Sequence, residues 1–405
     1  MTEQIVTPWK VEGNIDYNKL VKQFGTELID QKLIDRFENV IGKPVHPWIK
    51  RGIFFSHREL NGLLNAYEKD KDSVYLYTGR SSTSESMHTG HLIPFIMTKW
   101  LQDVLDCPLV IQMGDDEKYY FKDMEFNELY RLGFENAKDI IAFGFNPKKT
   151  FIFSNRDYRT KQCIGYEVLA SDMKKVVSAR TVAKVFGFGE KVEVKIGNET
   201  VVDTYSLKED VNVGMFDWAF YQSAASFSEA FPHIFSDKRR YCLVVYAIDQ
   251  DNYFRLARDI ADKMKLYKPC SIMSNFLPPL TGSSGKMNSS SGIEASIFLT
   301  DDAKTIREKV IKNAFSGGRQ TLKEHRQFGG DVLIDIPCQY LKYFEYDDKK
   351  LEEYHSKFAK GELTSTEIKN ILADKLAEII IKHQEERKKV TKEILEDFYS
   401  MKKLF

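Results

Sequence analysis

Between residues 73 and 154 the chain alternates between short apolar runs and longer amphipathic stretches, and this alternation limits the folds open to it. The runs "SVYLYTG" (73–79), "PLVIQMG" (108–114) and "TFIFS" (150–154) are typical of buried strands. Between them, "GHLIPFIMTKWLQDVL" (90–105) and "FNELYRLGFENAKDIIAFG" (126–144) have apolar residues at helical spacing. This alternation predicts an α/β fold built on a doubly wound parallel sheet.

The remaining sequence divides on either side of this pattern. "YCLVVYAIDQD" (241–251) and "CSIMSNFLP" (270–278) resume the strand pattern, whereas the chain beyond residue 300 has almost only helical patterns. We therefore predict a mostly helical N-terminal extension at 1–72, an α/β domain at 73–300 and an all-helical domain at 301–390. The tail at 391–405 is expected to pack back on the α/β domain. A charged, alternating segment at about 190–215 predicts a surface β-hairpin, to which the sequence assigns no role.

Composition excludes some classes of protein and leaves others open. The 405 residues include 59 Lys+Arg and 59 Asp+Glu. This balance gives no reason to expect a nucleic-acid partner, but it does not exclude one, because phosphate contacts depend on local patches. The five cysteines are far apart and include no Cys-x-x-Cys pair, which argues against a disulfide framework. No signal h-region opens the chain and no apolar run is long enough to cross a bilayer, so we expect a soluble, cytoplasmic protein.

The stretch "MHTGHLIPF" (87–95) places His88 and His91 around Gly90 where an apolar helix begins. Metal binding is disfavoured because no cluster of further ligands lies nearby. A buried structural histidine is the ordinary interpretation of a lone His. These two, however, follow a strand and open a helix at the carboxyl edge of a parallel sheet, where such folds bind ligands. The helix N-terminus offers free N–H groups to phosphate, and imidazoles can donate to phosphoryl oxygens, so we predict a nucleotide phosphate site.

A second motif, "SGKMNSSSG" (284–292), follows the last predicted strand. In isolation it is typical of a polar linker before the helical domain. Lys286 followed by a run of hydroxyls can instead grip phosphate and neutralise charge that develops on pyrophosphate. The order of the two motifs, with His-x-Gly-His first, favours the catalytic interpretation.

Taken in this order, the two motifs resemble the HIGH and KMSKS signatures of class I aminoacyl-tRNA synthetases. The likeness covers nearly the whole chain, from "VTPW" near its start to the closing "KLF". It is strongest to the eukaryotic-type tryptophanyl-tRNA synthetases of subclass Ic. The segments that carry it are "YLYTGR", "MHTGHLIPF", "TKWLQDV", "PLVIQMGDDEKYYFKD", "NAKDIIAFGF", "TFIFS", "AIDQDNYFR", "KMNSS", "SIFLTD", "AFSGGR" and "HRQFGG".

The resemblance implies a Rossmann catalytic domain and an all-helical anticodon-binding domain in an obligate homodimer. It also implies a reaction in two steps. The carboxylate of L-tryptophan attacks the α-phosphate of ATP, which is bound with Mg²⁺, and gives tryptophanyl-adenylate and pyrophosphate. The 2′-hydroxyl of the terminal adenosine of tRNA(Trp) then accepts the amino acid. Such a reaction needs positioning and charge stabilisation rather than a covalent enzyme nucleophile.

Site residues follow from the resemblance, position by position. Tyr77 and Gln112 fall where the family recognises the indole N–H, a single donor on a flat apolar body. Glu117, Gln222 and Gln250 fall where it holds the α-ammonium of the substrate, for which carboxylate and amide oxygens are suitable acceptors. No protein side chain is implied as a metal ligand. The expected ATP-binding set is His88, Gly90, His91, Lys286, Met287, Ser289, Ser290, Arg80 and Lys118.

The chain departs from the family pattern in two loops. Asn288 stands where the second motif has its first serine, and Ser81 and Ser82 stand where the family has Gly-Pro, which we expect to make that loop more mobile. In the helical domain, Arg319 and Lys369 align with positions that the family uses near the anticodon, where arginine can read single-stranded bases.

Three alternatives remain open on the sequence. A tyrosyl-tRNA synthetase shares the fold and the chemistry, but the context of Gln112 fits tryptophan better. A different His-x-Gly-His nucleotidyltransferase is disfavoured by the second motif and the helical domain. An inactive synthetase-like protein that binds RNA or protein partners has little reason to retain His88, His91 and Lys286.

Overall fold

A seven-stranded sheet forms the centre of the molecule in the computed structural model, which describes residues 5–6, 11–12, 15–81, 83–196, 199–282 and 296–404. The strand order is β3-β4-β11-β10-β5-β6-β7. The five strands from β11 to β7 are parallel, whereas β4 runs antiparallel to β11 and β3 antiparallel to β4. The strands are β3 (Glu27–Leu28), β4 (Phe54–Arg58), β5 (Val74–Arg80), β6 (Leu109–Met113), β7 (Thr150–Ser154), β10 (Tyr241–Ala247) and β11 (Cys270–Ser274).

Alternate residues of the parallel strands enter two separate apolar cores, one on each face of the sheet. Leu76 and Ile111 belong to one core, which also contains residues of helices α2, α4, α5, α7 and α18. Tyr77 and Val110 belong to the other, with residues of α1, α9, α10, α11 and α13. A strand that is buried on both faces needs apolar residues throughout, which explains the continuous apolar runs in the sequence. The predicted doubly wound, Rossmann-type fold is confirmed.

The N-terminal region is helical in large part, but it also supplies two strands to the central sheet. Residues Ile5–Val6 (β1) and Val11–Glu12 (β2) form a separate antiparallel pair. The helices here are α1 (Tyr17–Phe24), α2 (Gln31–Ile41), α3 (Pro47–Lys50) and α4 (Leu60–Lys69). Arg58, at the end of β4, forms a buried ion pair with Asp251 of α13 at 2.7 Å, which ties this region to the parallel part of the sheet.

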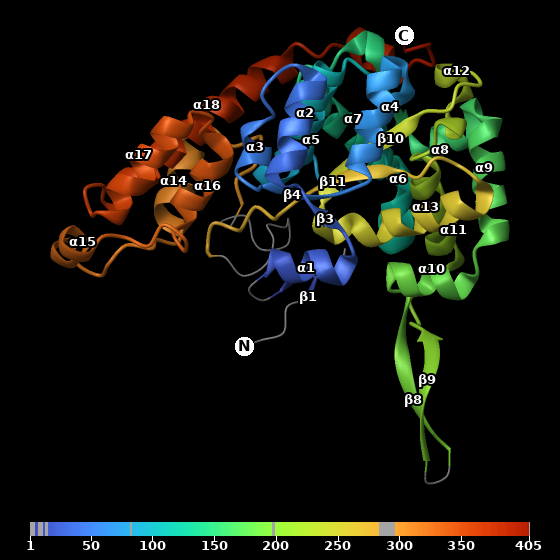
Figure 1. The fold of residues 1–405 in the computed structure, drawn as a ribbon, viewed down its shortest axis with the longest axis horizontal. Helices are drawn as coiled ribbons and strands as arrows, with labels where there is room; N and C mark the ends of the chain where they lie inside the picture. The colour runs from blue at the N-terminus through green and yellow to red at the C-terminus, as the bar shows by residue number, and fades with distance from the viewer. Residues whose placement is uncertain are drawn as a thin grey trace.

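Helices flank the parallel strands in chain order, and a hairpin interrupts them between β7 and β10. Strands β8 and β9 pair antiparallel and project from the body of the molecule (Figure 1), which confirms the predicted hairpin. The elements are α5 (Thr89–Leu105), α6 (Asp115–Phe121), α7 (Phe126–Ile141), α8 (Asn155–Asp157), a π-helical turn η3 (Tyr158–Gln162), α9 (Ile164–Val176), α10 (Ala179–Phe186), β8 (Gly189–Ile196), β9 (Glu199–Leu207), α11 (Val213–Ala224), α12 (Pro232–Phe235) and α13 (Asp251–Met264).

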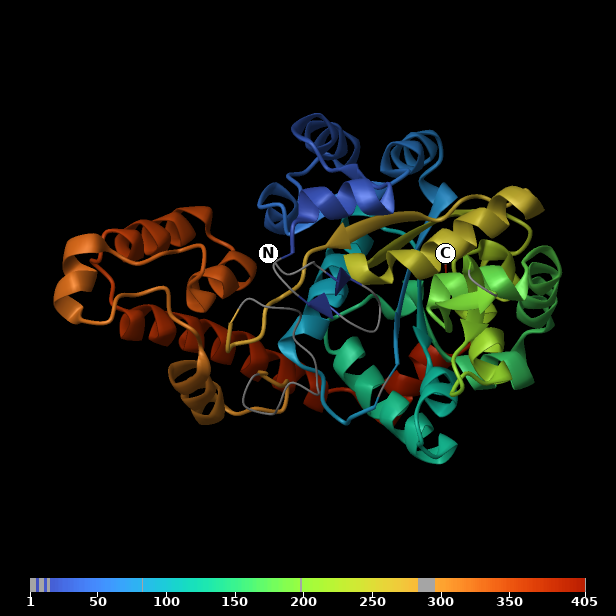
Figure 2. The same ribbon diagram turned by 90° about the horizontal axis from the view of Figure 1, so that it is seen from below.

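The chain after residue 300 is helical and extends to one side of the sheet domain (Figures 1 and 2). Its long helix α18 begins at a capping box, in which Thr364 and Glu367 satisfy each other's backbone N–H groups. At the other end of α18, Arg387 pairs with Asp139 of α7 at 2.9 Å, so this helix returns to the sheet domain. The helices are α14 (Ala303–Asn313), α15 (Leu322–Phe328), α16 (Ile336–Phe344), α17 (Asp348–Ala359), α18 (Ser365–Lys388) and α19 (Lys392–Tyr399).

The last helix, α19, lies against β7 and α7. The domain boundaries at 72, 300 and 390 stay predictions. Two strands of the first region, β3 and β4, join the central sheet, and α18, which lies within residues 301–390, pairs with α7 of the sheet domain at its end. Among the described residues, no helix combines the length and the apolar character needed to span a bilayer.

Candidate active site

A cavity of about 500 Å³ opens at the carboxyl ends of the parallel strands, between β5 and β10. From this point the chain continues from β5 to β6 in one direction across the sheet and from β10 to β11 in the other. The helices that follow β5 and β10, α5 and α13, lie on opposite faces of the sheet. Doubly wound sheets bind ligands at such a switch point, because diverging loops leave a crevice there. The predicted residues that line the cavity are Tyr77, Arg80, His88, Gly90, His91, Gln112, Glu117, Lys118, Gln222 and Gln250.

The two histidines form the first turn of α5, as predicted, and are held by backbone groups. The Nδ1 atom of His88 accepts from the N–H of Gly90 at 3.2 Å, and Nδ1 of His91 accepts from the N–H of His88 at 3.2 Å. Their rings stack with centroids 3.6 Å apart. This arrangement caps the helix and places both rings where the helix dipole favours an anion.

Arg80 brings a partly buried positive charge to the same place. Its Nη1 lies 2.8 Å from Nε2 of His91, and its Nε donates to Oδ1 of Asn136 at 3.1 Å. Burial lowers the pKa of the Arg80 guanidinium to about 10, so it remains charged at neutral pH. A cation beside a helix N-terminus can stabilise phosphoryl charge in a water-poor site.

Glu117 and Lys118 lie in the first turn of α6 and also line the cavity. The carboxylate of Glu117 accepts from the Lys118 ammonium and from the hydroxyl of Ser81, which follows β5. The described residues contain no cluster of His, Cys, Asp or Glu that could hold a metal ion.

The inner end of the cavity carries a tyrosine–amide pair from neighbouring strands. The hydroxyl of Tyr77 donates to Oε1 of Gln112 at 2.6 Å, and both side chains are buried. Strand register places Tyr77 beside Val110 and Gly79 beside Gln112, so the bare Gly79 lies next to the amide. A Cβ on Gly79 would lie 3.1 Å from the carbonyl oxygen of Gln112, which explains why the smallest residue stands there.

Two further amides lie around this pair. The Oε1 atom of Gln222, on α11, is buried without a hydrogen-bond partner among the described residues. Such an acceptor costs free energy unless a ligand donates to it. The Nε2 atom of Gln250 donates to Oδ2 of the buried Asp249 at 3.1 Å, which turns the amide oxygen of Gln250 away from that carboxylate. The cavity thus presents acceptors at its inner end and cations toward α5.

Some predicted residues fall outside the described part of the chain, namely Ser82, Lys286, Met287, Asn288, Ser289 and Ser290. Before them in the chain, Phe276 and Leu277 line the cavity. After them, the N–H of Leu299 donates to the carbonyl of Met87, the residue before His88, at 2.8 Å.

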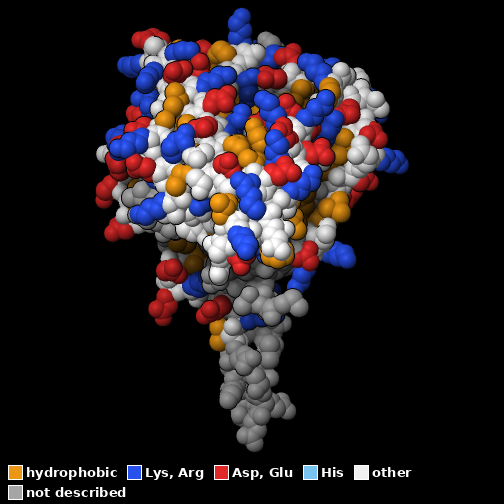
Figure 3. Space-filling view, turned by 90° about the vertical axis from the view of Figure 1, so that its left-hand side faces the viewer, with side chains coloured by type: hydrophobic (Ala, Val, Ile, Leu, Met, Phe, Trp, Pro, Cys, Tyr) orange, Lys and Arg blue, Asp and Glu red, His pale blue; other side chains and the backbone are white. Residues whose placement is uncertain are grey.

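The predicted anticodon residues are in the helical region, away from the cavity. Arg319 donates through Nε to the carbonyl of Gly329 at 3.0 Å, and Lys369 donates to the carbonyl of Ile311 at 3.0 Å. Burial lowers the pKa of Lys369. The face of the molecule on this side carries Lys, Arg, Asp and Glu side chains intermixed (Figure 3), in keeping with the net charge of zero.

The polar residues that contact the Gln112 amide were not predicted from the sequence. Its Nε2 donates to Oδ1 of Asn155 at 3.0 Å and to the hydroxyl of Tyr166 at 3.0 Å. Asn155 directly follows the β7 run "TFIFS", and a polar residue at the carboxyl end of a buried strand is the one signal that could have found it.

Comparisons with known proteins agree with this geometry. The family model for class I tRNA synthetases (W and Y) matches residues 69–380. The cytoplasmic tryptophan--tRNA ligase of Homo sapiens is 45% identical over 407 residues, which is 99% of this chain and 82% of that protein. The solved tryptophanyl-tRNA synthetase of Plasmodium falciparum has a TM-score of 0.84 and 42% identity, with 96% of each chain covered. That of Encephalitozoon cuniculi, bound to tryptophan, has a TM-score of 0.82 and 39% identity, covering 96% of this chain and 98% of the other. The chain therefore belongs to the class I tRNA synthetases (W and Y), among the eukaryotic tryptophan--tRNA ligases.

Proposed function

We propose that this chain is a cytoplasmic tryptophan--tRNA ligase. It activates L-tryptophan with ATP to tryptophanyl-adenylate and pyrophosphate, and then transfers tryptophan to the 2′-hydroxyl of the terminal adenosine of tRNA(Trp). The relatives with this activity match over nearly the full chain. The observation that carries the proposal is the cavity itself, in which the Tyr77–Gln112 pair faces the same space as the charged end formed by Arg80 and the two histidines.

Tyr77 and Gln112 are proposed to recognise the indole N–H. The Tyr77 proton is committed to Gln112, so the phenol oxygen and the second lone pair of the amide oxygen are left as acceptors. An indole offers one N–H donor and no acceptor, and it matches this arrangement. Trp218, Tyr253 and Phe254 line the cavity nearby and offer aromatic surface for the flat ring.

Glu117, Gln222 and Gln250 are proposed to hold the α-ammonium. The support is strongest for Gln222, whose buried Oε1 lacks a donor in the described part of the chain. An ammonium carries three donors and no acceptor, so it supplies what this oxygen lacks. With the ammonium and the indole both fixed, the carboxylate can point toward the histidine end of the cavity.

ATP is proposed to bind at the α5 end as its Mg²⁺ complex. His88, Gly90, His91, Arg80 and Lys118 are the described members of this subsite. The sequence motif adds Lys286, Met287, Ser289 and Ser290, which follow the cavity-lining residues Phe276 and Leu277 in the chain. Mg²⁺ supplies charge neutralisation to the phosphates. The side chains orient the α-phosphate for in-line attack by the tryptophan carboxylate and stabilise the charge that develops on the leaving pyrophosphate.

The transfer step needs a tRNA surface, for which Arg319 and Lys369 are proposed anticodon contacts. Both now donate to backbone carbonyls, yet each retains further N–H donors for a nucleotide. We also propose that the chain acts as a homodimer. Ile164 and Val168 lie one turn apart on α9 with 83% and 52% of their surface exposed. A pair of exposed apolar side chains at this spacing is suited to cover by a partner subunit.

The rival functions have less support. The hydroxyl of a tyrosine substrate both donates and accepts hydrogen bonds, so its site needs a donor as well as an acceptor. The hydroxyl of Tyr77 already donates its hydrogen bond to Gln112 and cannot be that donor. An inactive relative has no use for a partly buried cation at a helix N-terminus.

ATP–pyrophosphate exchange with the purified protein tests the proposal, with tryptophan and tyrosine supplied separately. We expect exchange with tryptophan alone, and we expect Lys286→Ala to lower it steeply. Exchange with tyrosine would retain the reaction class and reject the roles of Tyr77 and Gln112. A folded protein that exchanges with neither amino acid would favour the inactive relative.

A further inference from the structure

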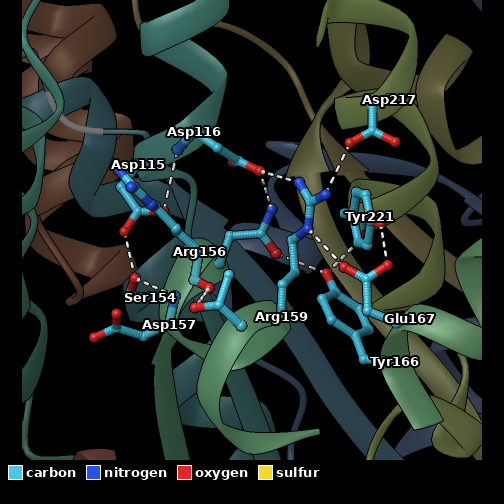
Figure 4. A network of polar contacts seen from close by, with 12 residues as sticks. Asp115, Asp116, Ser154, Arg156, Asp157, Arg159, Tyr166, Glu167, Asp217 and Tyr221 are labelled. Atoms are coloured by element: carbon cyan, nitrogen blue, oxygen red, sulfur yellow. Dashed lines mark hydrogen bonds and ion pairs between the residues drawn. The ribbon is translucent and has the colours of Figure 1, made fainter. Parts of the chain in front are cut away.

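A network of buried polar side chains adjoins the Tyr77–Gln112 pair. Figure 4 shows part of it, around Asp116 and Arg159. Its central members are Asp116 of α6 and Asn155 of α8, which are 4% and 0% exposed. The Nδ2 atom of Asn155 donates to Oδ2 of Asp116 at 2.6 Å. On its other side, Oδ1 of Asn155 accepts from Nε2 of Gln112 at 3.0 Å. A continuous row of hydrogen bonds therefore joins Asp116 to Tyr77.

Two acceptors favour one direction of this row: the Asp116 carboxylate at its end, and the carbonyl oxygen of Tyr221, which accepts from Nε2 of Gln112 at 3.4 Å. At pH 8, above the pKa of about 7 of Asp116, this carboxylate is mostly ionised and can only accept, so Asn155 turns its NH₂ group toward it. Its carbonyl oxygen then faces Gln112, which must turn its own NH₂ group toward Asn155. The Oε1 atom of Gln112 is left to accept from Tyr77 at 2.6 Å. If either amide were reversed, two acceptors would face each other in a buried site, which is costly.

We propose that Asp116 and Asn155 are positioning residues for substrate selection, because they fix the Gln112 amide with its oxygen toward Tyr77 and the bound indole N–H. This inference rests on the proposed function and extends it to residues that do not touch the substrate. A reversed Gln112 amide would donate to Tyr77 and occupy the acceptor that an indole N–H needs. This row of hydrogen bonds from Asp116 to Tyr77, called the relay below, therefore favours a substrate that donates a hydrogen bond at this point.

The surroundings hold Asp116 in place. Arg159 of η3 reaches its Oδ2 at 3.4 Å and is itself held by Asp217 at 2.9 Å and Glu167 at 3.1 Å (Figure 4). The Arg159 guanidinium also stacks on the ring of Tyr221, 3.5 Å from its centroid. Burial and the neighbouring Asp115 raise the pKa of Asp116 to about 7, against the opposing effect of Arg159. The other titratable groups that act on Asp116 or respond to it are Glu117, Tyr120 and Tyr166.

The adjacent Asp115 offers a matched control. It is also buried, at 4% exposed. It accepts from the hydroxyl of Ser154 and from the N–H of Arg156, whereas the Asn155 side chain donates to Asp116 instead. Asp115→Asn and Asp116→Asn thus remove one buried carboxylate each from consecutive positions of α6, and only the second removes the end of the relay.

The test compares tryptophan with its sulfur isostere, β-(3-benzothienyl)alanine, which has the same shape and no N–H donor. Both are assayed by ATP–pyrophosphate exchange at pH 8, and the ratio of their kcat/KM values is the readout. We expect D116N to lower this ratio about tenfold, in line with the loss of one oriented hydrogen bond. We expect D115N to leave the ratio unchanged, even where it lowers both rates through stability.

Asn155→Ala interrupts the relay one step nearer the cavity. If D116N does not fold, Asn155→Ala is used in its place, and it is expected to lower the ratio of kcat/KM values in the same way. Because both changes break one row, the double variant is expected to lose no more selectivity than either single variant. A D116N ratio equal to the wild-type ratio, or a D115N ratio lowered by the same factor, overturns the relay while the proposed function stands. A wild-type protein without tryptophan-dependent exchange overturns the proposed function and the relay with it.

Discussion

The guanidinium of Arg80 lies 2.8 Å from the imidazole of His91, measured from Nη1 to Nε2. This contact joins the last residue of β5 to the first turn of α5, across the charged end of the cavity. Asn136 of α7 holds the same guanidinium from behind. The positive charge is therefore fixed before any substrate binds, so the site spends little free energy on reorganisation when phosphate charge develops.

Removal of this charge should impair the use of ATP far more than the binding of tryptophan. We expect Arg80→Met to lower kcat/KM for ATP in pyrophosphate exchange about 100-fold or more, as when one preorganised donor is lost. The KM for tryptophan should change little. Arg131→Met is the control, because this arginine is on α7, the helix that holds Arg80 through Asn136, but its side chain is 48% exposed and pairs with Glu85 and Glu128 on the surface. An equal loss in both variants would contradict the role of Arg80.

The buried Oε1 of Gln222 has no hydrogen-bond partner among the described residues, so its removal should weaken binding of the ammonium group selectively. Gln222→Leu should weaken tryptophan binding roughly tenfold to a hundredfold, since a hydrogen bond to a charged donor is lost. Indole-3-propionate, which lacks the ammonium, should bind the variant and the wild type alike. Calorimetry with both ligands gives the two values, and a parallel loss for indole-3-propionate would show that the substitution disturbs the indole end instead.

The carboxyl group of Asp116 makes stability depend on pH in the direction opposite to an ordinary salt-bridged carboxylate. Its pKa is raised from 3.8 to about 7, mainly by burial. The folded state therefore holds a proton that the unfolded chain has lost between these values. The stabilisation that this bound proton gives to the folded state is fully present below pH 3.8 and is lost as pH rises through 7.

We expect the free energy of unfolding of the wild type to fall relative to D116N between pH 5 and pH 8, on the order of 1 kcal/mol or more. Urea titrations at several pH values give this difference. A difference between the two proteins that stays constant across the range would contradict the raised pKa.

The buried ion pair between Arg58 and Asp251 should contribute strongly to stability, because loss of one partner leaves a charge in the core. The two bonds measure 2.8 and 2.7 Å, and Asp251 is fully buried. Arg58→Met should lower the free energy of unfolding by about 3–5 kcal/mol. Lys304→Met, which breaks the exposed pair with Glu308, should change it little. If R58M proves as stable as K304M, β4 is not tied to the parallel strands in the way described.

The sheet could be predicted from the sequence where its strands are buried on both faces. Residues 74–80 and 109–113 have continuous apolar character because each side enters a separate core. The antiparallel strands β3 and β4 could not be found in this way. Strand β3 has only two residues, and Phe54–Arg58 of β4 includes polar residues inside a strand whose pattern is set by its neighbours rather than by its own sequence.

Some residues of the candidate site could be predicted from the sequence, and others could not. Tyr77, Gln112 and the two histidines stand in short motifs at strand ends, and the resemblance carried by these motifs pointed to them. Asp116 and Asn155 are 39 residues apart and meet only through the fold. Buried polar pairs of this kind leave no periodicity in the sequence, since their partners are chosen by tertiary contact.

The most direct test of the account is aminoacylation, with radiolabelled tryptophan and transcripts of tRNA(Trp) and tRNA(Tyr). Exchange alone reports adenylate formation, whereas aminoacylation also requires the transfer step. The account predicts tryptophan-dependent charging of tRNA(Trp), none of tRNA(Tyr), and a large loss of charging in R80M. Charging of tRNA(Tyr) with tyrosine, or no charging by a folded protein that binds tryptophan and ATP, would contradict it.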